Sequence, residues 1–211
     1  PLWAGPLLAV ASLGVFAGGI VVEDKLTLQT DPVQWVNQES QGIKDFRSVE
    51  AQTGSSSELG IYVVDQKPDQ IFSQQVVDFM RKFSNRNLEK YPEDLLTSTS
   101  VVDTVGDLTD VPGASDVTPR AEDVKAAYDV APVDIQTSTV NPQAGAMNLI
   151  FRYGQKDLES RQPVIDEIET STQAGGATPA PPGVNATPSG LAVVGVGLLE
   201  NLTSNRIMLT Y

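Results

Sequence analysis

The sequence predicts an α+β fold of two similar strand–helix–strand units, preceded by one helix long enough to cross a membrane. Residues 1–22 contain no charged side chain. A helix rises about 1.5 Å per residue, so this length matches a hydrocarbon core of about 30 Å. The chain then turns polar, and a strand, a short polar turn and an amphipathic helix occur twice in it. These two patterns give the fold class.

The apolar segment, residues 1–22, is assigned to a transmembrane helix. A secretory signal has a basic start and a shorter apolar run of about 7–15 residues, which this segment lacks. A buried helix of a soluble domain is the other alternative. The chain opens at Pro1 without Met, so we expect a piece of a longer protein. Residues 207–211 are apolar again and are predicted to begin a second membrane helix.

The first strand–helix–strand unit is expected around residues 59–102. Residues 59–64 (LGIYVV) are typical of a buried strand. Gln66-Lys67-Pro68 follows as a turn, and apolar side chains from Ile71 to Phe83 recur at helical spacing. We expect the return strand at residues 96–102.

The second unit is expected around residues 147–188 and repeats the same order. Residues 147–153 (MNLIFRY) are predicted to be a strand, Gln155-Lys156 a turn, and the run through Val164 and Ile168 a helix. The return strand is placed at residues 184–188. The two Gln-Lys pairs lie 89 residues apart. Order and spacing together favour duplication over chance similarity.

Residues 23–206 are therefore taken as one polar domain that contains both units. Between the units, residues 92–119 carry six acidic side chains and no Lys or Arg. Their spacing is too loose for a calcium loop, so a solvated acidic loop is favoured. Residues 120–131 (RAEDVKAAYDVA) follow as a short amphipathic helix with acids near its start, as the helix dipole prefers.

Composition excludes several function classes. The net charge is −13, and such a chain is a poor partner for nucleic acid. The chain has no Cys and no His. This removes disulfides, thiolate zinc sites, cysteine nucleophiles and the Ser-His-Asp triad. We therefore expect no enzyme, and assign no catalytic residue, no cofactor-binding residue, no metal ligand and no cofactor.

Three stretches, in this order, resemble the resistance–nodulation–division (RND) superfamily, and within it the MMPL-like hydrophobe/amphiphile exporters. The first is LTLQTDPVQW at residues 26–35, directly after the apolar helix. The second is the strand and helix at residues 59–83. The third is GVNATPSGL at residues 183–191, which leads into ENLTSNR at residues 200–206. The order of elements carries the resemblance more than any single motif.

The resemblance implies a porter domain, the large extracytoplasmic loop of these exporters, built from two ferredoxin-like β-α-β units. It implies proton-driven export of hydrophobic or amphiphilic compounds such as lipids or drugs, at the plasma or inner membrane, with residues 23–206 extracytoplasmic. The expected partners are the lipid bilayer, the transported small molecules, and the remaining transmembrane helices and second porter domain of the same protein. A homo-oligomer, the substrate and the half of the transporter concerned are left open.

Apolar side chains on loops, such as Trp35, Phe46 and Leu191, are candidates to line a substrate path, but packing in the core is the simpler interpretation. No site is assigned to them. Three other functions remain open: a single-span membrane-anchored binding or sensor domain without transport, an accessory domain of the SecD/SecF type, and a carboxylate-based enzyme such as a glycosidase.

Overall fold

The computed structural model of the chain describes residues 4–23, 37–53, 55–109, 117–154, 158–190 and 193–197. The chain divides into two compact units, residues 1–30 and residues 31–211. Several of the predictions above fall outside the described residues. These are the stretches at 26–35 and 200–206, the turn at Gln155-Lys156, the second membrane helix at 207–211, and Leu191.

The first unit contains helix α1, Ala4–Glu23. Its six largest apolar side chains between residues 5 and 18 are each more than half exposed; they are Leu7, Leu8, Val10, Leu13, Val15 and Phe16. The predicted helix is thus present. Among the described residues, however, no helix has both the length and the apolar character that a membrane crossing requires. The transmembrane assignment of residues 1–22 therefore gains no support from the structure.

The second unit is a mixed α+β structure built on one antiparallel sheet. Its strands are β1 (Ser55–Asp65), β2 (Leu95–Thr99), β4 (Ala146–Gly154) and β5 (Val184–Ser189). They lie in the order β2-β4-β1-β5, and each neighbouring pair is antiparallel. The two-residue strand β3, Val140–Asn141, also pairs with β4. The four strands predicted from the repeat are therefore present and share one sheet.

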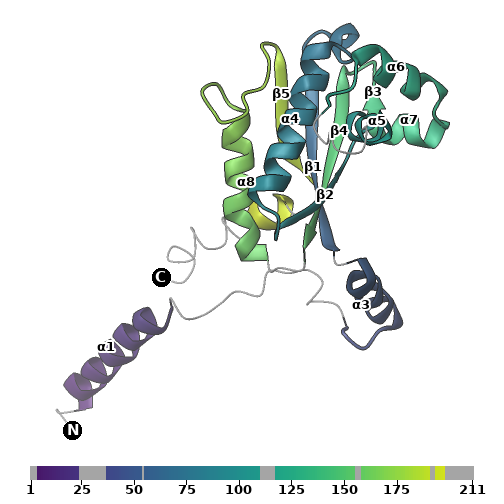
Figure 1. Cartoon of the computed structure of the whole chain (residues 1–211). Helices are drawn as coiled ribbons and strands as arrows, with labels where there is room; N and C mark the ends of the chain where they lie inside the picture. Colours follow the sequence, from purple (N-terminus) through teal and green to yellow (C-terminus); the bar gives the residue numbers. More distant parts are fainter. Residues whose placement is uncertain are drawn as a thin grey trace. The chain divides into compact units, whose positions relative to one another are not determined.

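In each predicted strand–helix–strand unit, one helix connects two strands of the sheet. Helix α4 (Gln74–Lys90) joins β1 to β2, and helix α8 (Leu158–Thr172) joins β4 to β5. The two strands of each unit do not pair with one another, because a strand of the other unit lies between them. Figure 1 shows α4 and α8 side by side on one face of the sheet. Lys90 of α4 and Glu167 of α8 form an ion pair that joins the two helices.

The hydrophobic core lies between this sheet face and the two helices. Alternate residues of β1, namely Leu59, Ile61 and Val63, are fully buried, because successive side chains of a strand point to opposite faces. The neighbouring strand β4 contributes Phe151, whose ring centroid lies 6.1 Å from that of Phe83 in α4. The apolar spacing that predicted α4 thus corresponds to its buried face.

The opposite face of the sheet is more polar. Tyr62 of β1 is 40% exposed, and Glu58 of β1 stands opposite Arg152 of β4 in the strand register. The sheet ends at β5, which contains Pro188 and whose Ala186 carbonyl accepts a hydrogen bond from the Thr172 hydroxyl. Both features reduce the capacity of this edge to pair with another strand.

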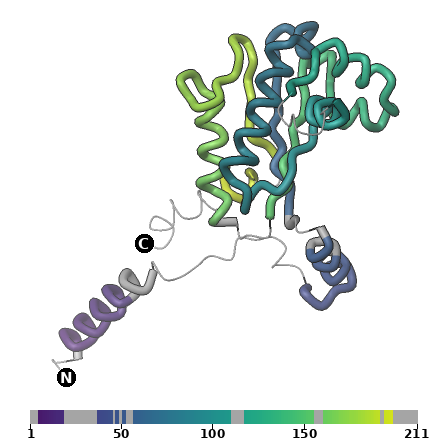
Figure 2. The backbone as a smooth tube through the Cα atoms, viewed as in Figure 1, coloured from purple at the N-terminus to yellow at the C-terminus, as the bar shows by residue number. Residues whose placement is uncertain are grey.

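An inserted segment, residues 100–145, connects the first strand–helix–strand unit (β1, α4, β2) to the second (β4, α8, β5). It contains α5 (Val101–Thr109), α6 (Ala121–Val130), α7 (Val133–Thr139) and β3. Figure 2 shows α6 and α7 as a teal tube at one side of the sheet, away from α8. The Gln74 side chain bonds the Pro119 carbonyl and the Ala121 amide, which attaches the start of α6 to the start of α4. The ring of Phe72, which precedes α4, packs on that of Tyr128 in α6, with 5.2 Å between the ring centroids.

Two predictions on this segment were wrong. The return strand expected at residues 96–102 ends at Thr99, because Ser100 caps helix α5, which begins at Val101. The solvated acidic loop expected at residues 92–119 includes this helix, and its Asp103 is only 2% exposed. The predicted helix at residues 120–131 is confirmed as α6. The described residues outside the insert also include helix α3 (Gln41–Thr53), the 3₁₀-helix η1 (Pro68–Gln70) and a short helical stretch at residues 193–197.

Candidate functional site

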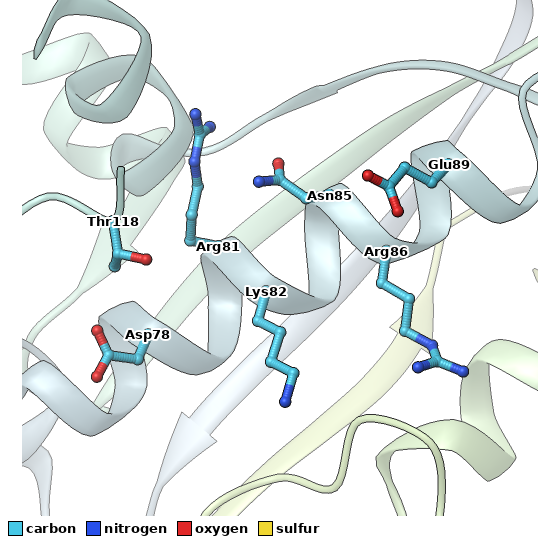
Figure 3. A pocket seen from close by; sticks show the side chains of 7 residues that line it. All are labelled: Asp78, Arg81, Lys82, Asn85, Arg86, Glu89 and Thr118. Carbon is cyan, nitrogen blue, oxygen red and sulfur yellow. The ribbon is translucent and has the colours of Figure 1, made fainter. Parts of the chain in front are cut away.

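A shallow hollow of about 390 Å³ follows the exposed side of α4. Six of its lining residues lie on α4 and one, Thr118, precedes α6; the six are Asp78, Arg81, Lys82, Asn85, Arg86 and Glu89. Figure 3 shows Lys82 and Arg86 pointing to one side of the helix and Arg81 and Asn85 to the other. The lining is therefore charged, with both signs present, and its cations do not converge on one point.

Arg81 lies at the wall of this hollow and reaches into the space between α4 and α5. Its guanidinium Nη1 lies 3.4 Å from Asp103 Oδ1 and 3.1 Å from Asp107 Oδ1. The Arg81 and Asp103 side chains are almost completely buried, whereas that of Asp107 is 70% exposed. A buried charge needs a partner because leaving water is costly. The inserted segment thus supplies, from α5, the two carboxylates that neutralise Arg81 of α4.

Gly106 gives the guanidinium its space. A Cβ atom at this position would lie 3.0 Å from the Arg81 Cζ atom. A side chain here would push against a buried, ion-paired group, so the glycine is explained by close packing. Asp103, Gly106 and Asp107 lie within about one turn of α5 and together form the surface on which Arg81 rests.

Three serines surround the Asp103 carboxylate. Ser100 precedes α5: its hydroxyl accepts a bond from the Asp103 amide at 2.9 Å and donates one to Asp103 Oδ2 at 3.0 Å. The first of these bonds satisfies an otherwise unpaired amide at the start of the helix, as a serine at the N-cap position does. The Ser84 hydroxyl of α4 donates to that of Ser98 in β2. The cluster therefore joins α4, β2 and α5 through polar groups in the protein interior.

Burial raises the pKa of the Asp103 carboxyl above its usual value, because the charged form loses its hydration. Hydrogen bonds from Ser100 and Ser98 and the positive charge of Arg81 oppose this shift, but more weakly. The fold thus favours the protonated form of Asp103 more than water does.

A second buried arginine, Arg161 of α8, packs beside Tyr153 near the end of β4. Its guanidinium Cζ lies 5.2 Å from the centre of the Tyr153 ring, and Nη1 donates to the Ser57 hydroxyl. Burial also raises the pKa of the Tyr153 phenol. Contact with an aromatic face offsets part of the cost of burying a guanidinium. This group joins α8 to β1 and β4.

The residues singled out from the sequence do not form this site. Trp35 and Leu191 fall outside the described residues, and Phe46 lies in α3 at a position whose side chain is not described. Arg81 and Asp103 were not predicted. The sequence contains one signal that points to them: Ser100 followed by Asp103 three residues later is the pattern of a capped helix start. Within the described ranges, acidic side chains do not gather into a set of three suited to a metal ion.

Comparison of the chain with protein-family models, with curated proteins and with solved structures found no match.

Proposed function

We propose that this chain is the extracytoplasmic domain, with one membrane helix, of a proton-driven RND-type exporter of hydrophobic or amphiphilic compounds. The observation that carries the proposal is the strand order β2-β4-β1-β5 with all neighbours antiparallel. Two ferredoxin-like β-α-β units that interleave their strands produce this order, with both helices on one face. The sequence resemblance implies the same architecture for the porter domain.

The character of α1 supports the membrane part of the proposal. From Ala4 to Val22 it carries no charge, and its exposed apolar side chains include Leu7, Leu13 and Phe16. A helix that is apolar all round is found in the core of a large protein or in a bilayer. Since no described helix meets the requirements of a span, membrane insertion is the first point to establish by experiment.

In this proposal the domain supplies the substrate path and other helices supply the energy. Proton-carrying acids belong to later membrane helices, where an ionisable group is costly and therefore functional. The two β-α-β units move as rigid bodies, with the substrate passing beside them. The predicted partners are the bilayer, the transported amphiphile, the remaining helices and a second porter domain.

The hollow along α4 favours the alternative, a membrane-anchored binding or sensor domain. Its lining consists of charged and polar side chains only. Small-molecule sites are usually lined by apolar side chains with few polar groups, and an amphiphile path needs such a lining. A charged lining suits a polar ligand that a sensor would bind, so this alternative stays with the proposal until transport is measured.

Vesicle flotation of the chain tests the membrane helix. We expect the chain to float with lipid vesicles after a carbonate wash, and Leu13→Arg to prevent this, because a charge at the centre of a span costs about 2.5–3.5 kcal/mol. Leu108→Arg is the matched control: it places the same charge on an 80% exposed leucine of the folded domain. A chain that stays in the soluble fraction, or that floats equally well with Leu13→Arg, contradicts membrane insertion.

A further inference from the structure

The polar cluster around Asp103 can be satisfied in either protonation state. When the carboxyl is ionised, Arg81 Nη1 and the Ser100 hydroxyl donate to it. When it carries a proton, it becomes a donor, and the hydroxyls of Ser84 and Ser98 lie beside it to accept. Hydroxyl groups both donate and accept, so the cluster accommodates the change by rotating O–H bonds.

Arg81 also retains a partner in both states. Asp107 lies nearer to its guanidinium than Asp103 does, at 3.1 Å against 3.4 Å. Because Asp107 is largely exposed, its own charge is stabilised by water. Protonation of Asp103 therefore leaves no isolated buried charge in this pair, and removes one poorly hydrated carboxylate from the interface between α4 and α5.

The other charged groups near α5 are engaged elsewhere. Helix α6 packs on α5, and its charged side chains form pairs of their own: Arg120 binds Glu122 and Asp123, and Lys125 binds Asp129. Helix α4 contributes Arg81 and Ser84 to the cluster, and β2 contributes Ser98. Among the described residues that face the cluster, Asp103 is thus the buried group that titrates.

We propose that Asp103 is a proton-operated latch: uptake of a proton tightens α5 against α4 and β2, and loss of the proton loosens it. Helix α5 is therefore held more firmly in acid than at neutral pH. This inference concerns the domain itself and holds whether or not the chain belongs to an exporter.

The direction follows from linkage. The carboxyl has a raised pKa when α5 is packed and the ordinary Asp value when α5 is released into water. The packed state therefore binds the proton more tightly, so acid favours packing. This contribution is fully present below the ordinary value near 3.8 and is lost as the pH rises through the raised pKa.

Hydrogen exchange of the α5 amides in the full chain, followed from pH 7.5 to pH 4.5 and corrected for intrinsic rates, tests the latch. We expect protection of residues 101–109 to rise as the pH falls, by up to about tenfold for each unit by which the pKa is raised. The α8 amides, residues 158–172, serve as the internal reference and should change much less. Protection of α5 that stays constant or falls in acid overturns the proposal.

Two variants identify the group that acts. In Asp103→Asn, which carries no titratable proton, protection of α5 should no longer depend on pH. Asp107→Asn, on the exposed carboxylate of the same helix, should keep the dependence. If Asp103→Asn keeps the pH dependence too, another group titrates and the proposal fails.

Carboxyl NMR of the unsubstituted chain supplies a check that needs no variant to fold. The pH midpoint of the Asp103 titration must coincide with the pH midpoint of the change in α5 protection, and a mismatch overturns the latch.

Discussion

Replacement of Arg81 by Leu should lower the free energy of unfolding at pH 7.5 by about 3–5 kcal/mol, because removing one partner of a buried ion pair leaves the other charge uncompensated. Asp103 would then be a buried carboxylate without its cation. Urea denaturation of the full chain measures the effect. Arg86→Leu is the matched control, because Arg86 lies on the same helix, is exposed and makes no ion pair within the described residues. It should change stability by less than about 0.5 kcal/mol.

The double variant Arg81→Leu with Asp103→Leu sharpens this prediction. Apolar side chains of similar volume can replace a buried ion pair at little cost, so the double variant should be more stable than Arg81→Leu alone. A loss of stability equal to the sum of the two single losses would show that the residues do not interact. An Arg81→Leu loss as small as that of Arg86→Leu would contradict the buried pair itself.

Replacement of Gly145 by Ala should destabilise the fold by about 2–5 kcal/mol. Gly145 has φ +60°, and a Cβ there would lie 2.6 Å from Pro68 Cα and 2.8 Å from the Asp65 carbonyl oxygen. A non-glycine residue in this left-handed conformation costs about 1–2 kcal/mol, and crowding against backbone adds about 1–3 kcal/mol. The shift of the urea midpoint reports the total.

Gly183 provides the control for crowding. It has φ +86°, but a Cβ there meets nothing within 4 Å. Gly183→Ala should therefore show the conformational cost alone, about 1–2 kcal/mol. Equal losses for the two glycines would mean that the turn after β1 and the turn before β4 do not lie as close as the structure places them.

The sequence predicted the elements whose signal is local. In strand β1, buried side chains such as Ile61 alternate with more exposed ones. In α4, Val76, Met80 and Phe83 recur at helical spacing on the buried face. These periodicities are visible in a short window of residues. Both return strands were placed within a few residues of β2 and β5. The strand order depends on pairing between distant segments, and the repeat alone did not determine it.

The polar interior could not be predicted in the same way. Arg81 lies within a helix of exposed charges, and nothing in its sequence neighbours distinguishes it from Arg86. Its burial depends on the absence of a side chain at Gly106 and on two aspartates more than 20 residues away. The long run of acids without a cation suggested a solvated loop, because composition does not reveal that an arginine elsewhere in the chain neutralises part of it. The Ser100–Asp103 spacing was the local signal that went unused.

The membrane assignment rests on the apolar sequence of residues 1–22, and the proposed export function rests on the resemblance. The strand order of the sheet agrees with the architecture that the resemblance implies. The most direct test of the exporter is to read the coding sequence beyond Tyr211. The proposal predicts that the apolar run from Ile207 continues for about 20 residues, followed by further spans, one of them containing a buried acid, and by a second strand–helix–strand domain. A polar domain without further spans would contradict the exporter and leave the anchored binding or sensor domain as the better account.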